Sequence, residues 1–138
     1  MGKIILDVND VCKSFSYGSN NLEVLKNFTL QLNKKEIITI SGQSGCGKST
    51  ALNIMGTLDR QDSGTISFEG IDMSKLDENR LANFRNTKIG FVFQFHHLLP
   101  ELTALENASI PIWIKGAPFQ ENDLIDLFET LGIKDRMN

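Results

Sequence analysis

The sequence predicts an α/β fold with an antiparallel β flank, and three patterns along its 138 residues predict it. Strand-like segments dominate the first third of the chain. A run of β-branched residues then leads into a glycine-rich loop and a helix, the order expected of a strand–loop–helix unit. A second apolar run and two helical segments follow. Strands that precede such a unit are typical of an α/β core with added antiparallel strands.

The flank is predicted from two segments of alternating polarity. Residues 4–8 and 28–32 place apolar side chains at every second position, as half-buried strands do. The turn cluster Gly-Ser-Asn-Asn at residues 18–21 lies between them, so we expect the two strands to pair in antiparallel fashion. Residues 36–41, Glu-Ile-Ile-Thr-Ile-Ser, form a continuous apolar run that predicts a strand buried on both faces.

The middle of the chain predicts two helices and two more strands. Residues 49–58 form the first helix, with apolar residues at helical spacing. Residues 62–64 form a turn before a short strand at residues 65–68. Residues 77–85 form the second helix, capped by Asp77. Residues 88–94 contain Ile-Gly-Phe-Val-Phe, which predicts a second buried strand. The apolar positions of the first helix are Leu52, Ile54, Met55 and Leu58.

Two helices are expected in the last third. Thr103 and Glu106 have the spacing of a capping box, so a helix should begin there. Residues 122–131 form an amphipathic segment, and Gly132 follows as its stop signal.

The net charge, the apolar runs and the cysteines of the sequence argue against several classes of protein. A net charge of −3 disfavours a nucleic-acid binder, which usually has an excess of basic residues. We found no apolar run near the roughly 20 residues that a membrane span needs. Cys12 and Cys46 are far apart and have no CxxC or histidine partners, which disfavours a disulfide framework or a zinc site. A reducing cytosol suits such a chain.

The sequence motif that carries most information is a phosphate-binding loop. It matches G-x-x-x-x-G-K-[ST] in full. Glycines let the backbone curl and point its N–H groups at phosphates, the lysine adds a cation for the β- and γ-phosphates, and the next hydroxyl can ligate Mg²⁺. A nucleotide with Mg²⁺ is therefore the expected ligand, and this loop alone does not choose between a kinase, a GTPase and a transport ATPase. The loop consists of Gly42, Gln43, Ser44, Gly45, Cys46, Gly47, Lys48 and Ser49, and Thr50 follows with a further phosphate contact.

Four other residues invite chemistry that we weigh against simpler interpretations. Cys46 lies where a helix N-terminus could activate a thiol, but a small residue tolerated in a backbone-lined loop explains it better. His96 and His97 are adjacent and lack a carboxylate or cysteine cluster, which favours a partner-facing loop over a metal site. Trp113 is expected in a core or an interface.

A second motif resembles the ATP-binding-cassette (ABC) transporter ATPases. The segment IGFVFQFHHLLP at residues 89–100 resembles their Q-loop, and LTALEN at residues 102–107 resembles the segment that follows it. The loop at residues 42–50 is then their Walker A motif. The wording QFHHLLP is most similar to the lipoprotein-releasing (Lol) branch. Macrolide-export and cell-division ATPases of the same family remain alternatives.

The resemblance implies further roles. Gln94 would contact Mg²⁺ or the attacking water, and its loop would touch integral membrane subunits. Phe15 would stack on adenine, with Tyr17 as a second candidate and packing within the β flank as the alternative for Phe15. The resemblance implies a homodimer in the full-length parent, which would power lipoprotein release from the cytoplasmic face of the inner membrane.

The family pattern is incomplete in this sequence. After Gln94 the 138 residues contain no LSGGQ-like signature, no apolar run ending in Asp-Glu and no assignable switch histidine. We therefore expect residues 1–138 to be the N-terminal part of an ABC ATPase domain. Such a piece is expected to bind ATP weakly and to hydrolyse it poorly, if at all. A non-catalytic nucleotide-binding or interaction fragment is the rival of another class. The Q-loop wording argues against a third candidate, a phosphate-loop kinase.

Overall fold

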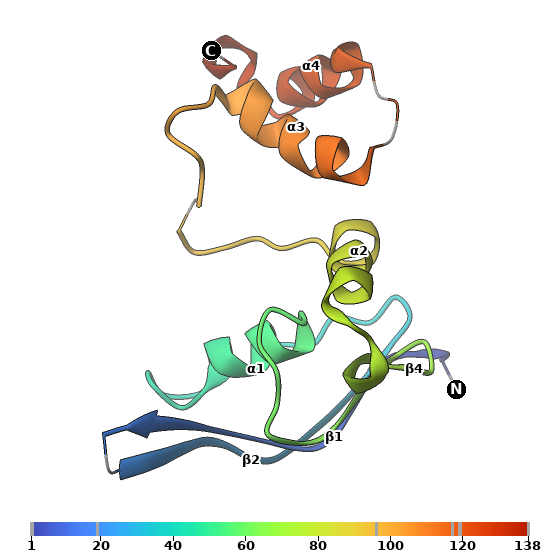
Figure 1. Cartoon of the computed structure of the whole chain (residues 1–138). Helices are drawn as coiled ribbons and strands as arrows, with labels where there is room; N and C mark the ends of the chain where they lie inside the picture. Colours follow the sequence, from blue (N-terminus) through green and yellow to red (C-terminus); the bar gives the residue numbers. More distant parts are fainter. Residues whose placement is uncertain (1, 19, 96, 117, 119, 138) are drawn as a thin grey trace. The chain divides into compact units, whose positions relative to one another are not determined.

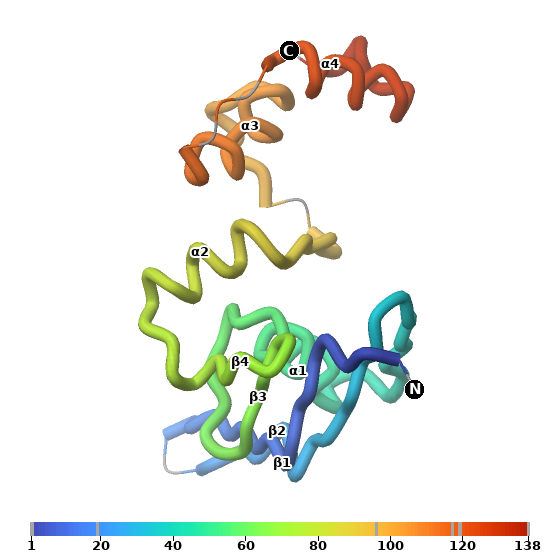
Figure 2. Tube along the Cα trace, turned by 90° about the vertical axis from the view of Figure 1, so that its right-hand side faces the viewer, coloured from blue at the N-terminus to red at the C-terminus, as the bar shows by residue number. Residues whose placement is uncertain are grey.

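A computed structural model describes residues 2–18, 20–95, 97–116, 118 and 120–137. The chain divides into two units, Met1–Ala82 and Asn83–Asn138, and each is described here by itself. Figures 1 and 2 trace the order of the elements along the chain. The first unit contains the sheet and the glycine-rich loop.

The sheet is antiparallel and has the strand order β2-β1-β3-β4. The expected flank pairing is confirmed, because Leu6 lies opposite Leu32 and Val8 opposite Leu30. The chain turns between the two long strands, where Tyr17 faces Asn20. The strands are β1 (Ile4–Tyr17), β2 (Asn20–Asn33), β3 (Ser63–Phe68) and β4 (Ile71–Asp72).

A bulge interrupts β1 and β2 near their centres. The register shifts between Val8 and Val11, and Asp10 and Asn27 both have positive φ, at 49° and 47°. Aspartate and asparagine adopt this backbone region more readily than most residues. The Asp10 N–H donates to Thr29 Oγ1 at 3.0 Å and so is satisfied at the bulge. The bulge also shifts the β1–β3 register, between Asn9 and Cys12.

The prediction of a turn at residues 62–64 was wrong by two residues, since β3 already begins at Ser63. Gly64 lies against the bulge, where a Cβ would come within 2.5 Å of the Asp10 carbonyl oxygen. Glycine there serves a close approach of two backbones inside the sheet, which the local sequence does not distinguish from a turn.

Helix α1 (Lys48–Met55) packs beside the sheet and closes the core of the first unit (Figure 1). Its buried residues Ala51, Ile54 and Met55 follow the helical period. The helix ends at Gly56, so Leu58 falls outside it and is 46% exposed, and Leu52 is 56% exposed. The predicted apolar face was therefore half wrong. The sheet contributes Leu6, Val8, Val11, Leu25 and Ile66 to the core.

The two predicted buried strands, residues 36–41 and 88–94, were both wrong. Neither is a strand, and both expose apolar side chains: Ile37 is 93% and Val92 is 103% exposed. A strand exists only when a neighbour completes its hydrogen-bond ladder. In the part of the chain that the structure describes, the sheet consists of β1 to β4 alone. Burial of both faces requires neighbouring strands and covering layers, and the described residues supply neither for these two segments.

Helix α2 (Glu78–Lys88) runs from the first unit into the second. The expected cap is confirmed, because the Arg80 N–H donates to Asp77 Oδ1 at 2.8 Å. The helix extends three residues past its predicted end at Arg85. Its polar sequence has few apolar positions, and the buried one is Leu81. A short 3₁₀ turn, Met73–Lys75, precedes it.

The second unit contains α3 (Ala104–Lys115), α4 (Glu121–Thr130) and a 3₁₀ turn at Lys134–Arg136. The capping box is confirmed at Thr103 and Glu106. The predicted last helix is confirmed within one residue at each end, and Gly132 follows with φ 71°. Leu124 and Phe128 are the buried face of α4. None of the helices in the described residues is long and apolar enough to cross a membrane.

The capping box makes the stability of α3 dependent on pH. Backbone and side-chain hydrogen bonds from Thr103 hold the pKa of the Glu106 carboxyl below its ordinary value of 4.5. A lowered folded-state pKa means that the contribution is fully present above the unfolded pKa and is lost as the pH falls through the folded one. We expect Glu106→Gln to lower the melting temperature at pH 7. The difference in melting temperature between wild type and variant should shrink towards zero as the pH is lowered.

Thermal melts of both proteins from pH 7 to pH 3 check this expectation. Glu101→Gln, two residues before the helix cap, is the control, because Glu101 takes no part in the box. A difference between wild type and Glu106→Gln that stays constant over this pH range would contradict the assignment.

Candidate nucleotide-binding site

The glycine-rich loop rests on β2 through Gly47. This glycine has φ 93°, a conformation that L-residues rarely adopt. A Cβ at this position would lie 2.9 Å from both the carbonyl oxygen and Cγ1 of Val24, and 3.1 Å from Leu25 Cδ2. The loop residue that immediately precedes α1 therefore lies directly against the strand. This contact sets the position from which α1 begins.

Lys48 folds back over the loop. Its Nζ donates to the carbonyl oxygens of Gly42 at 2.8 Å and Gln43 at 2.6 Å, and lies 3.8 Å from Cys46 Sγ. An ammonium group has three donors, and sulfur is a weak acceptor. Two donors thus hold the cation above the loop, and the third is available to a stronger acceptor such as a phosphate oxygen.

The N-terminus of α1 faces the same loop without a side-chain cap. Gly47 occupies the N-cap position and supplies no capping hydrogen bond. The first N–H groups of a helix lack intrahelical partners and carry about half a positive charge together. Ser49 is exposed in this first turn, while Thr50 is partly buried. Backbone donors, a cation and a hydroxyl residue therefore come together in one short segment, which suits an anion.

Residues 25–138 match the family model described as "ABC transporter". The chain belongs to the ABC transporter family. It is 44% identical over 134 residues to the lipoprotein-releasing system ATP-binding protein LolD of Bacteroides fragilis, covering 96% of this chain and 60% of that protein. LolD of Geobacter metallireducens is 52% identical over 112 residues, which cover 81% of this chain and 50% of that protein. The chain thus spans about 60% of the length of the first of these ABC relatives.

Solved ABC structures share the fold. The dimeric structure of MJ0796, a bacterial ABC transporter cassette, matches with a TM-score of 0.79 at 39% identity, over 84% of this chain and 50% of that one. A post-hydrolysis state of the same ATP-binding cassette, bound to ADP and Pi, matches with a TM-score of 0.80 at 40% identity, over 86% and 52%. The α/β cassette fold with its antiparallel flank is therefore confirmed.

Phe15 lies near the end of β1, opposite Leu22 of β2, and is 38% exposed. Val24, which contacts the phosphate loop at Gly47, is two residues further along β2. A strand advances by about 3.3 Å per residue, so Phe15 belongs to the same end of the strand pair as the loop. Tyr17, the second aromatic candidate, is 75% exposed and two residues further from the loop.

Gln94 lies in the second unit, in the segment between α2 and α3, and its role stays a prediction. His97 contacts the Phe93 ring edge-on, with the ring centroids 4.9 Å apart. His96 lies outside the described residues. Among the described residues, no group of three or more His, Cys, Asp or Glu could hold a metal ion.

Cys46 is exposed, and its Sγ packs against the backbone of Gly42, where a Cβ would lie 2.8 Å away. A side chain at position 42 would therefore have to displace this thiol. Trp113 is 52% exposed on α3.

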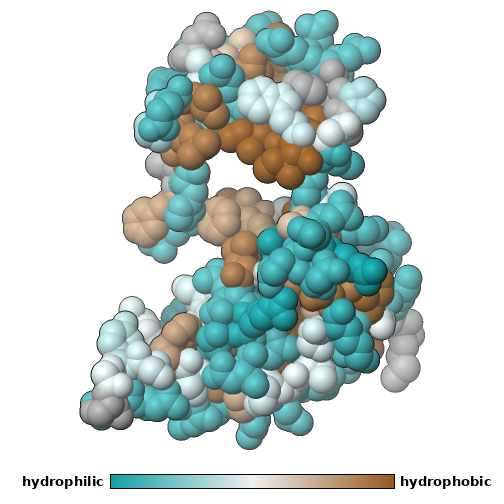
Figure 3. All heavy atoms as spheres, in the orientation of Figure 1, coloured by the Kyte–Doolittle hydropathy of each residue, from teal (hydrophilic) through white to brown (hydrophobic). Residues whose placement is uncertain are grey.

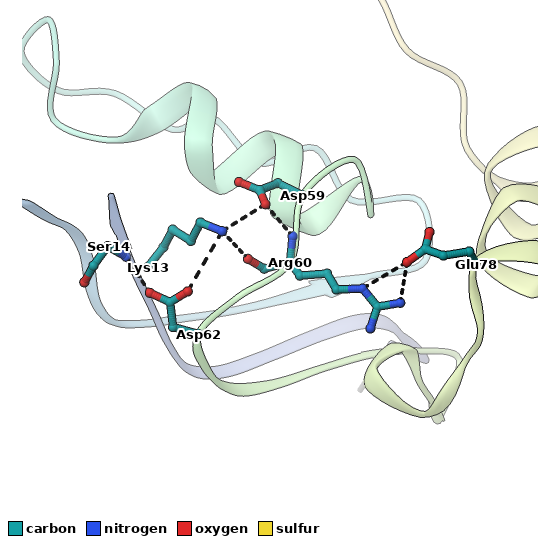
Figure 4. Close-up of polar contacts among 6 residues, drawn as sticks. All are labelled: Lys13, Ser14, Asp59, Arg60, Asp62 and Glu78. Carbon is teal, nitrogen blue, oxygen red and sulfur yellow. Dashed lines mark hydrogen bonds and ion pairs between the residues drawn. The ribbon is translucent and has the colours of Figure 1, made fainter. Parts of the chain in front are cut away.

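A polar network that no local sequence pattern indicates surrounds the turn after α1 (Figure 4). Lys13 of β1 forms an ion pair with Asp59, which follows α1, at 2.9 Å. The partners are 46 residues apart, so no local pattern could link them. The same turn continues to Arg60, whose guanidinium donates to Glu78 Oε1 at 2.6 Å.

Proposed function

We propose that residues 42–50 bind the phosphates of ATP and that the chain is the phosphate-binding part of an ABC transporter ATPase. One observation carries the proposal: the uncapped N-terminus of α1 and the Lys48 ammonium face the same glycine loop. A phosphate in the loop would accept from backbone N–H groups and from the Lys48 donor whose present acceptor is the weak one, Cys46 Sγ. The MJ0796 cassette of known structure, bound to ADP and Pi, supports nucleotide as the anion.

The donor set also fits magnesium. Mg²⁺ prefers hard oxygen ligands and keeps several waters. One protein hydroxyl and the nucleotide phosphates are therefore sufficient as its other ligands. Ser49, exposed in the first turn of α1, would supply the hydroxyl. The ion would neutralise charge on the β- and γ-phosphates. Gln94 is proposed as a further contact to the ion or to the attacking water.

The 138-residue chain is expected to bind nucleotide without hydrolysing it efficiently. Hydrolysis requires a residue that orients water and charge stabilisation around the γ-phosphate. After Gln94 the 138 residues contain no apolar run ending in Asp-Glu that would provide it. We therefore expect nucleotide binding with little or no release of phosphate from the 138-residue chain.

For the whole protein we propose an ATPase subunit of a lipoprotein-releasing system at the cytoplasmic face of the inner membrane. The LolD relatives support the cargo class, and the dimeric MJ0796 cassette supports a homodimer. Membrane subunits would contact the Gln94 loop and its surroundings. Apolar side chains gather over α3 in Figure 3, where Ile114 is 72% exposed, which suits a protein partner. Macrolide-export and cell-division ATPases are the alternatives within the family.

Titration with a fluorescent ATP analogue, with and without Mg²⁺, tests the phosphate site. We expect Lys48→Met to weaken binding by about 10-fold to 100-fold, the range of a lost hydrogen bond to a charged group. Lys75→Met is the matched control, because Lys75 is a surface lysine of the same unit whose ion pair is with Asp72.

Equal affinities for wild type and Lys48→Met would overturn the proposal. A parallel phosphate-release assay distinguishes a chain that only binds nucleotide from one that also hydrolyses it. Binding without release supports a nucleotide-binding part, whereas turnover abolished in Lys48→Met would show that the chain is itself catalytic.

A further inference from the structure

The ammonium group of Lys13 is held in one place by three oxygens (Figure 4). Nζ lies 2.9 Å from Asp59 Oδ1, donates to the Arg60 carbonyl oxygen at 2.6 Å, and lies 3.9 Å from Asp62 Oδ1. The Lys13 side chain is only 12% exposed, unlike its partners at 36% and 49%. A flexible lysine with this many partners and so little exposure has lost most of its freedom.

The acceptors are themselves fixed. Asp59 Oδ1 also accepts the Arg60 N–H at 2.7 Å. Asp62 Oδ2 accepts the Ser14 N–H at 2.7 Å, and the Asp62 N–H donates to the Cys12 carbonyl oxygen at 2.9 Å. Residues 12–14 of β1 are thus tied to the turn that follows α1, the helix that begins at the phosphate loop.

The same ammonium lies over the ring of Phe15, 5.2 Å from its centroid. Lys13 and Phe15 are two residues apart on β1, where the β1–β2 register shifts between Lys13 and Ser14. A cation at this distance from an aromatic face is attracted to it. One face of the ring is therefore occupied by Lys13, while the residue remains 38% exposed.

We propose that Lys13 is a positioning residue for base recognition: it holds the Phe15 ring so that its other face can stack on the base of a bound nucleotide. The inference rests on the proposed phosphate site and on the stacking role that the family resemblance implies for Phe15, and it adds the residue that holds the ring. Lys13 itself touches neither base nor phosphate. Because the network also anchors the turn after α1, the ring and the phosphate loop keep a constant separation.

Competition experiments distinguish this role from general stability. A fluorescent ATP analogue is displaced from the 138-residue chain by ATP or by inorganic tripolyphosphate, which has phosphates but no base. Lys13→Met is expected to weaken the binding of ATP by about 3-fold to 10-fold, which is the contribution of one cation–π contact or of part of one base stack. The affinity for tripolyphosphate is expected to stay unchanged.

Three further variants sharpen the test. Lys13→Arg should retain the preference for ATP over tripolyphosphate, because a guanidinium also pairs with carboxylates and lies over aromatic rings. Asp59→Asn keeps Lys13 but weakens the ion pair that anchors it, so it should give the same selective loss of ATP affinity. It replaces Lys13→Met in the test if that variant does not fold. Lys26→Met is the control, since Lys26 is 70% exposed and pairs with Glu23 of its own strand, β2.

The double variant Lys13→Met/Phe15→Leu gives the decisive comparison. It should lose no more ATP affinity than Phe15→Leu alone, because Lys13 acts only through the ring. Additive losses, or equal losses for ATP and tripolyphosphate in Lys13→Met, would overturn the inference while the phosphate site stands. A wild-type chain displaced by neither competitor would overturn the phosphate site, and this inference with it.

Discussion

Gly64→Ala is expected to destabilise the first unit by about 2 to 5 kcal/mol, the sum of left-handed strain and overpacking. Gly64 has φ 86°, and a Cβ there would lie 2.5 Å from the Asp10 carbonyl oxygen and 2.6 Å from that of Asn9. Both contacts are with backbone of β1, which cannot rotate away as a side chain could. Either β3 moves out of the sheet or the bulge in β1 is lost.

Gly70→Ala provides the matched control for this prediction. Gly70 has almost the same φ, 84°, but a Cβ there would meet nothing within 4 Å. Its replacement should cost only the strain, about 1 to 2 kcal/mol. Urea unfolding followed by circular dichroism measures both variants against wild type. Equal midpoints for the two would show that the close approach of β3 to the bulge does not matter.

Gly47→Ala is expected to weaken nucleotide binding at least about 10-fold and to lower stability by about 2 to 4 kcal/mol. The new Cβ would meet the Val24 carbonyl oxygen at 2.9 Å, again a backbone atom. The loop must then lift from β2 and take the N-terminus of α1 with it. Backbone N–H groups directed at a phosphate tolerate such a shift poorly.

The stability part of this prediction is checked by Gly45→Ala. Gly45 also has a positive φ, 81°, in the same loop, but the space around it is open. Thermal melts of the two variants without nucleotide compare strain alone with strain plus contact. A larger loss for Gly45→Ala would contradict the seating of the loop on β2. Titration of Gly47→Ala with fluorescent ATP, at a temperature where it is folded, measures the binding part.

The sequence predicted the features that a few neighbouring residues specify. The Asp77 cap and the Thr103–Glu106 capping box were predicted from spacing within ten residues, and the structure confirms both. The phosphate loop was predicted from the same kind of local spacing, and its binding role stays a prediction. The antiparallel hairpin was predictable for the same reason, because alternation and a turn cluster lie in one continuous segment. Such features depend on local backbone geometry and local hydrogen bonds.

The apolar runs at residues 36–41 and 88–94 were interpreted as buried strands, and this prediction failed. Their composition indicates burial, but a strand also needs a ladder partner, and the sheet of the described residues pairs β1 to β4 only. The prediction of a turn at Gly64 failed for a different reason. A glycine in a turn and a glycine in close contact with another backbone have the same local sequence pattern.

By itself, then, the sequence determined the glycine-rich loop motif, the helix caps and the antiparallel pairing of the hairpin, together with the family whose motifs it contains. The tertiary structure alone decided which strands form and that Gly47 seats the loop on β2. It alone joined Lys13 to Asp59, 46 residues away, and placed the same ammonium over Phe15. The physical reason is range: a cap or a turn is completed by its neighbours in sequence, whereas a ladder, a close backbone contact or an ion pair is completed by a distant segment.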